Sequence, residues 1–266
     1  MSDPSHAHPA VVVDRHGPVA CVTLARPEKA NAMDAEITDA LLAAVLALHD
    51  DPDVRAMVLT GQGGAFSAGG DFETIRAMRA DRQLREKVLA AHQELFWAMT
   101  QLPFPTVAAV NGPAVGAGVT VALLCDLVVM AEDTFLSDPR VSLGLLDGAG
   151  GLLLWPLLTS LSAAKEHLLL GDRVRGVEAH RLGLANRAVP ASDVLEEALQ
   201  LAKRLGALPP QAARQARQLL NFHIDRVAAL LPQCARAEIE CFDTEEHRAL
   251  LERLSARVAA KNASTP

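Results

Sequence analysis

The segment TVAAVNGPAVGAGVTVALLC (Thr106–Cys125) opens with a β-branched run, continues through a glycine-rich turn and ends in a run of apolar residues. The first part predicts a buried strand, Thr106–Val110, and the last part predicts a buried helix, Val119–Cys125. The same order occurs upstream, where the predicted strand Val54–Thr60 enters the loop GQGGAFSAGGDF. This alternation of strand, glycine loop and helix predicts an α/β layer fold with ligands at the strand ends.

The rest of the chain divides into an α/β part and a helical part. Strands are expected at Val19–Leu24 and Leu127–Ala131, a helix is expected after the cap residue Asp34, and another helix is expected from Ile75 to Met99. Strand patterns nearly vanish after about residue 160, and amphipathic helices rich in Ala, Leu, Arg and Glu run from 192 to 260. We therefore predict a core over 1–200 and a helical oligomerisation region over 201–266.

Composition excludes several classes of protein. Half of the 266 residues are hydrophobic, which is ample for a packed core, and the formal charge of −7 argues against a nucleic-acid groove. The charge-free stretch 95–125 is interrupted by prolines and glycines too often for a membrane span. The four cysteines lack disulfide or metal spacing, and MSDPSHAHPA has no signal-peptide pattern, so a cytoplasmic protein is expected.

The common catalytic and phosphate-binding motifs are absent from the sequence. GxGxxG, GxxxxGK[ST], GxSxG and HExxH do not occur, so no dinucleotide cofactor, metal or serine nucleophile is expected. What remains is a pair of glycine loops, each leading from a strand toward a helix. Such loops either form tight turns only or aim two backbone N–H groups at one point, as in an oxyanion hole.

Several motifs in fixed order resemble the crotonase superfamily, the enoyl-CoA hydratases and isomerases. They include RPEKANAMD (Arg26–Asp34), FSAGGDF (Phe66–Phe72), NGPAVGAG (Asn111–Gly118) and VSLGLLDGAGG (Val141–Gly151), and the likeness extends over roughly residues 20 to 245. The resemblance implies a crotonase-like spiral of ββα units with a C-terminal helical trimerisation region. It also implies a homotrimer or dimer of trimers that binds acyl-CoA thioesters, with coenzyme A as part of the substrate and no separate cofactor.

The same resemblance assigns residues to the binding of the thioester. The backbone N–H groups of Gly70 and Ala117 are expected to form the oxyanion hole. The residues expected to contact the CoA portion and the acyl chain are Lys29, Ala30, Ala68, Asp71, Phe72, Thr120 and Arg140.

Two of these positions depart from the pattern of the hydratases. Thr120 and Arg140 stand where hydratases carry their two glutamates. Addition of water needs an acid and a base that face one water molecule, and arginine stays protonated at any useful pH. Ordinary hydration is therefore not expected.

Asp147, in the loop GLLDGAGG, is the residue selected as proton shuttle, in a pocket walled by leucines that is expected to raise its pKa. The other interpretation of Asp147 is a helix cap. Asp138 is expected to be structural, and pairing of Arg140 with either aspartate favours a structural or substrate-orienting role.

The function expected is that of a lyase or isomerase of fatty acid metabolism that stabilises a thioester enolate. Isomerisation, C–C bond chemistry and thioester hydrolysis remain open as the reaction. The alternative is an acyl-CoA-binding protein with reduced catalysis.

Overall fold

A six-stranded sheet forms the centre of the molecule. The computed structural model describes residues 10–263, with side chains to residue 256. The strand order is β1-β2-β3-β4-β6-β9, in which β1 is antiparallel to β2 and all other neighbours are parallel. The strands of this sheet are β1 (Val11–His16), β2 (Val19–Leu24), β3 (Ala56–Gly61), β4 (Thr106–Val110), β6 (Leu127–Ala131) and β9 (Arg187–Val189).

A second, three-stranded sheet holds the segment that follows the NGP turn. It consists of β5 (Ala114–Val115), β7 (Phe135–Ser137) and β8 (Val174–Arg175), with β7 in the middle. The N–H of Gly116 donates to the carbonyl of Ser137 over 2.9 Å. The second sheet therefore fixes the loop that leads into helix α4 (Ala117–Leu123).

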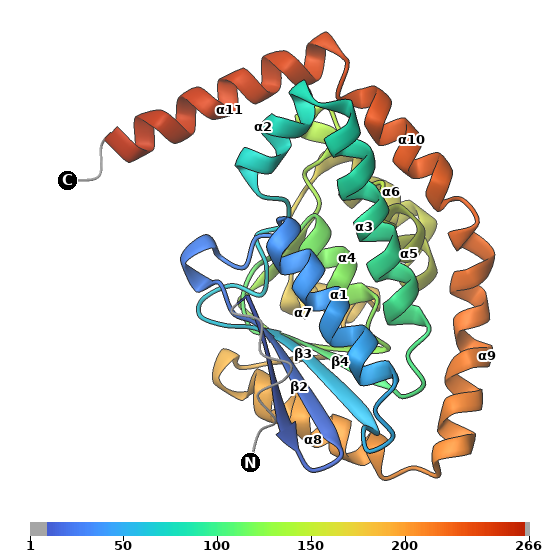
Figure 1. Ribbon diagram of the computed structural model, residues 1–266. Helices are drawn as coiled ribbons and strands as arrows, with labels where there is room; N and C mark the ends of the chain where they lie inside the picture. Colours follow the sequence, from blue (N-terminus) through green and yellow to red (C-terminus); the bar gives the residue numbers. More distant parts are fainter. Residues whose placement is uncertain (1–9, 264–266) are drawn as a thin grey trace.

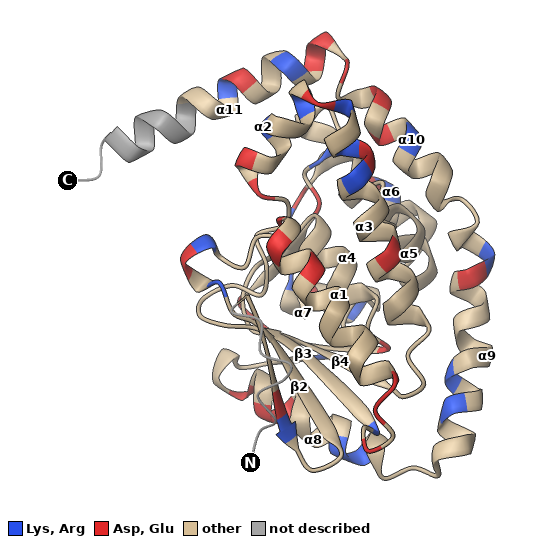
Figure 2. Cartoon of the chain, in the orientation of Figure 1, with Lys and Arg blue, Asp and Glu red and all other residues tan. Residues whose placement is uncertain are grey.

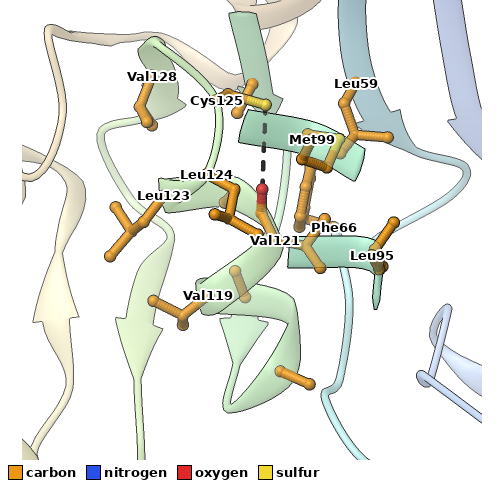
Figure 3. Packing of buried hydrophobic residues seen from close by; sticks show 14 of the residues in the cluster. Leu59, Phe66, Leu95, Met99, Val119, Val121, Leu123, Leu124, Cys125 and Val128 are labelled. Carbon is orange, nitrogen blue, oxygen red and sulfur yellow. Dashed lines mark hydrogen bonds between the residues drawn. The ribbon is translucent and has the colours of Figure 1, made fainter. Parts of the chain in front are cut away.

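Helices cover both faces of the central sheet (Figure 1). Helix α1 (Ala35–His49) packs on β1 and β2 and against α3 (Arg82–Thr100), and α8 (Val194–Gly206) packs on β2, β3, β4 and β6. Figure 3 shows part of the larger core, in which Phe66 and Leu59 lie among side chains from α3 and α4. Valine and alanine fill the smaller core beneath α8, where the sheet and helix approach closely.

The chain ends in three helices that run along the outside of the molecule (Figure 1). Helices α9 (Pro210–Ala228) and α10 (Leu231–Cys241) follow one side, and α11 (Glu245–Ala263) extends away from it. Charged side chains of both signs occur on these helices, whereas strands β2–β4 carry few charges (Figure 2). The remaining helices are α2 (Phe72–Ala80), α5 (Gly151–Leu158), α6 (Leu161–Leu170) and α7 (Gly176–Leu182).

The α/β fold and the C-terminal helices confirm the predicted fold class. The predicted strands 19–24, 106–110 and 127–131 have the predicted bounds. The helix predicted from Ile75 to Met99 is instead two helices, because the Asp81 side chain accepts hydrogen bonds from the N–H groups of Gln83 and Leu84 and so starts α3 anew. Strand β1 was not predicted.

The proposed boundary at residue 200 falls inside α8. Since α8 packs on the central sheet, the core extends to the end of this helix, and the peripheral helices begin at Pro210. The segment 1–9, on which the signal-peptide prediction rests, lies outside the described residues. Among the helices that are described, none has the length and apolar character needed to cross a bilayer.

Candidate active site

Gly70 and Ala117, the two predicted oxyanion donors, line the same cavity, whose volume is about 130 Å³. Gly70 ends the loop after β3 and bridges to Met33, and Ala117 is the first residue of α4. Within residues 10–263, neither N–H donates to a protein acceptor. For Ala117 this follows from its place in the first helical turn, where N–H groups have no partner inside the helix.

Two glycines explain why the backbone reaches this shape. Gly69 has φ +83°, and a Cβ atom there would lie 2.4 Å from the carbonyl oxygen of Val115. Gly116, just before α4, has φ +50°. Both conformations disfavour residues with a Cβ atom, so the two loops approach each other only with glycine at these positions.

Of the residues predicted to bind CoA, Ala68 and Asp71 line this cavity, and Lys29, Ala30 and Phe72 do not. Lys29 is half-exposed on a short 3₁₀ turn, with its Nζ 3.8 Å from an Asp34 carboxylate oxygen. Ala30 accepts a hydrogen bond of 2.9 Å from the Ala68 N–H, which joins the Lys29 turn to the Gly70 loop.

At the other side of the Gly70 loop, Asp71 lines the cavity and caps α2 by accepting from the Thr74 N–H. Phe72 begins that helix. The Lys29 turn is thus joined to the Gly70 loop by a backbone hydrogen bond, and only the Gly70 loop reaches the cavity.

Arg140 lines the cavity and forms ion pairs with both neighbouring aspartates. Its Nε and one terminal nitrogen donate to the two Asp138 oxygens over 2.8 and 2.6 Å. The other terminal nitrogen donates to Asp147 Oδ1 over 2.7 Å. The charge of Arg140 is therefore already balanced within the protein, and this is the pairing that favours a structural or orienting role.

Asp147 is 2% exposed and does not line the cavity. Its Oδ1 also accepts from the Ala149 N–H, and its Oδ2 accepts from the Thr120 hydroxyl over 3.1 Å. Burial raises the pKa of the Asp147 carboxyl, and the Arg140 charge opposes that rise. Thr120 thus supports the ion pair, and Asp147 holds the loop before α5 in place.

Two titratable residues that the sequence analysis did not select also line the cavity: Glu238 of α10 and His92 of α3. Glu238 is 6% exposed and accepts a 2.6 Å hydrogen bond from the Gly148 N–H. Burial raises the pKa of Glu238 to about 8. Burial, with the nearby Arg140 charge, lowers the pKa of His92 to about 4.

One sequence signal for Glu238 exists. Leu231, Ala235, Glu238 and Phe242 are spaced 4, 3 and 4 apart, so they share one face of a helix. A glutamate among apolar residues on such a face is rarely solvated, and burial of a carboxyl needs a partner. His92 carries no comparable signal.

Comparisons with known proteins identify the family of this chain. The sequence model of the enoyl-CoA hydratase/isomerase family matches residues 14–252. The chain therefore belongs to the enoyl-CoA hydratase/isomerase family, which is the crotonase superfamily of the prediction.

Relatives cover most of the chain. The short-chain-enoyl-CoA hydratase of Clostridium acetobutylicum is 29% identical over 90% of this chain and 91% of its own length. The carnitinyl-CoA dehydratase of Salmonella typhi is 36% identical over 77% of both chains. The crystal structure of an enoyl-CoA hydratase/isomerase from Mycobacterium paratuberculosis superposes with a TM-score of 0.88 at 39% identity, covering 92% of this chain and 98% of that one.

Proposed function

We propose that this protein binds an acyl-CoA thioester and stabilises its enolate with the N–H groups of Gly70 and Ala117. The observation that carries the proposal is that Gly70 and Ala117 line one cavity and that neither N–H has a protein acceptor among the described residues. A thioester oxygen that gains negative charge accepts hydrogen bonds from both N–H groups. Preorganised donors of this kind account for a large part of the rate enhancement of many enzymes.

The reaction we propose is not ordinary hydration. Thr120 and Arg140 occupy the two positions at which the sequence analysis expects the hydratase glutamates. The Thr120 hydroxyl does not ionise near neutral pH, and Arg140 is held charged because Asp147 and Asp138 raise the pKa of its guanidinium. Isomerisation, C–C bond chemistry and thioester hydrolysis all need the enolate or oxyanion that the proposed hole stabilises.

Calorimetric titration with CoA, acetyl-CoA and butyryl-CoA tests the binding proposal. The thioesters are expected to bind more tightly than free CoA, because only they place a carbonyl oxygen between the two N–H donors. A protein that binds no thioester contradicts the proposal.

An acyl-CoA-binding protein without catalysis is the second candidate function. It is favoured by the ion pairs that occupy Arg140 and Asp147, since these remove from the pocket the shuttle that the sequence analysis selected. Binding of thioesters without turnover of any of them would support this candidate.

A further inference from the structure

The chain turns a corner between α10 and α11, and this corner, residues 241–247, forms part of the wall of the cavity that Gly70 lines. That cavity is the acyl pocket of the proposed function. Phe242, in the corner, is 1% exposed and lines the pocket together with Leu143 and Leu145 of the loop before α5. The corner must therefore stay in place for the pocket to keep its shape.

His247 joins the corner to the loop that carries Leu143. Its side chain is buried, and its Nδ1 lies 2.8 Å from the carbonyl oxygen of Leu143. Because a carbonyl oxygen only accepts, Nδ1 carries the hydrogen and donates it. The two backbones are also close, since a Cβ atom at Gly144 would lie 3.0 Å from the His247 Cα. His247 thus holds the corner against the loop.

The other ring nitrogen of His247 has no hydrogen-bond partner. Nε2 is buried and makes no hydrogen bond within the part of the chain that the structure describes. The ring packs edge-on against Phe242, with ring centroids 5.0 Å apart. A neutral ring leaves only a lone pair at Nε2, whereas a protonated ring places a buried N–H there without an acceptor. A buried unpaired donor costs free energy, and a charged one costs more.

The charged groups that face the ring also oppose its protonation. Burial lowers the pKa of His247, the hydrogen bond to Leu143 raises it, and the charges of Arg79 on α2 and Arg85 on α3 lower it further. Asp243, the acid of the corner, is paired with Arg85 at 2.7 Å. The loop 141–145 carries no titratable residue. The other titratable residues of the corner and the adjoining turns are Arg82, Cys241, Glu245, Glu246 and Arg248, all at least partly exposed.

We propose that His247 is a pH-operated latch: the neutral ring holds the α10–α11 corner closed on the pocket, and protonation of the ring releases the corner. A proton on Nε2 finds no acceptor while the corner is closed, whereas water accepts this N–H once the corner opens. Opening carries Phe242 away from the pocket wall, so access to the pocket increases as the pH falls. The latch is made of contacts within this chain, and it holds whichever ligand the pocket takes.

The direction of the pH effect follows from comparing the two states. The ordinary pKa of histidine is about 6.5, and the closed ring has a lower one. Below about pH 6.5 the open state therefore binds a proton that the closed state lacks, and the ratio of closed to open corners falls by up to about tenfold per pH unit. Above pH 7 the ring is neutral in both states and the ratio is constant. Glu238 acts in the opposite sense, because burial raises its pKa to about 8 and acidification favours its buried, protonated form.

Hydrogen exchange followed by mass spectrometry tests the latch. The quantity measured is the protection of peptides that cover 241–247, relative to the exchange rate of an unstructured peptide at the same pH, with β4 as the internal reference. Between pH 7.5 and pH 5 the corner is expected to lose about tenfold in protection, whereas β4 is expected to change by less than about twofold. An unchanged corner, or an equal loss in the corner and in β4, overturns the proposal.

His247→Asn separates the latch from other effects of pH. The asparagine amide still donates toward the Leu143 carbonyl but takes up no proton in this range, so protection of the corner is expected to stay within about twofold from pH 7.5 to pH 5. His49→Asn is the control, because His49 is exposed on α1 and its loss should leave the wild-type response intact.

A His247→Asn protein whose corner still opens at pH 5 overturns the role of His247. If this variant is open at every pH, the wild-type profile decides the question. Opening confined to the range below about pH 6.5 supports the latch, and opening that already begins above pH 7 overturns it. These measurements use the protein without a thioester, so their outcome is independent of the proposed function.

Discussion

At the scale of single residues, the substitution of two expected glutamates by Thr120 and Arg140 predicts slow hydration. The rate of crotonyl-CoA hydration is expected to be lower than that of a competent hydratase by orders of magnitude, because each lost acid–base group costs about 10²–10⁴-fold. A spectrophotometric assay at the enoyl thioester absorbance measures this directly. Efficient hydration would show that Thr120 and Arg140 do not stand in place of the hydratase glutamates.

The buried carboxyl of Glu238 also predicts how stability depends on pH. Its pKa is about 8 in the folded protein and near 4.5 when solvated, so between these values the folded state binds a proton that the unfolded state lacks. Raising the pH through this window therefore destabilises the fold, by up to about 1.4 kcal/mol per pH unit from this group. Urea unfolding from pH 5 to pH 8 should show a flatter profile for Glu238→Gln than for the wild type, and Glu240→Gln should follow the wild type.

At the scale of elements, Arg217 ties helix α9 to the core. It is 6% exposed, pairs with Asp126 at 2.7 Å and donates to the carbonyl groups of Met99, Thr100 and Leu102 at the end of α3. Arg217→Ala removes the cationic partner of the Asp126 carboxylate and one donor from each of these carbonyl groups. We expect a loss of about 3–5 kcal/mol of unfolding free energy, as for other broken buried pairs.

Urea unfolding measures this loss, and hydrogen exchange locates it in α9. Arg214→Ala is the control, because Arg214 is exposed on the same helix and its loss is expected to change stability by no more than about 0.5 kcal/mol. Equal effects of the two substitutions would show that Arg217 does not anchor the helix.

At the scale of the whole molecule, large apolar side chains remain exposed in the single chain. On α9, Leu219, Leu220 and Phe222 are 73%, 68% and 62% exposed. Such a surface is typical of an interface between subunits. It agrees with the expectation from the family resemblance that three or six copies assemble.

Light scattering is therefore expected to give about three or six times the chain mass of 28.2 kDa. Replacing Leu220 and Phe222 by glutamate should shift the protein toward smaller species. Leu46→Glu, at an exposed leucine of α1, should leave the mass unchanged. A wild-type monomer at micromolar concentration contradicts the assembly.

The sequence by itself determined the features that depend on short-range patterns. β-Branched runs located β4 and β6, and Asp34 starts α1 by accepting from the Ile37 N–H, as a cap residue should. The glycines of the two loops take the positive-φ conformations that only glycine adopts readily, as at Gly69 and Gly116. These features need only neighbouring residues, because strand period, helix caps and positive-φ glycines are local properties.

Only the tertiary structure decided which titratable groups share the acyl pocket. Asp147 lies in the loop in which a proton shuttle was predicted. In the structure it pairs with Arg140 and does not line the cavity. Glu238 and His92 enter the cavity because α10 packs on α3, a contact between segments about 150 residues apart. Local periodicity shows which face of α10 is buried. Long-range packing decides which elements cover that face, and the resulting burial raises the pKa of Glu238.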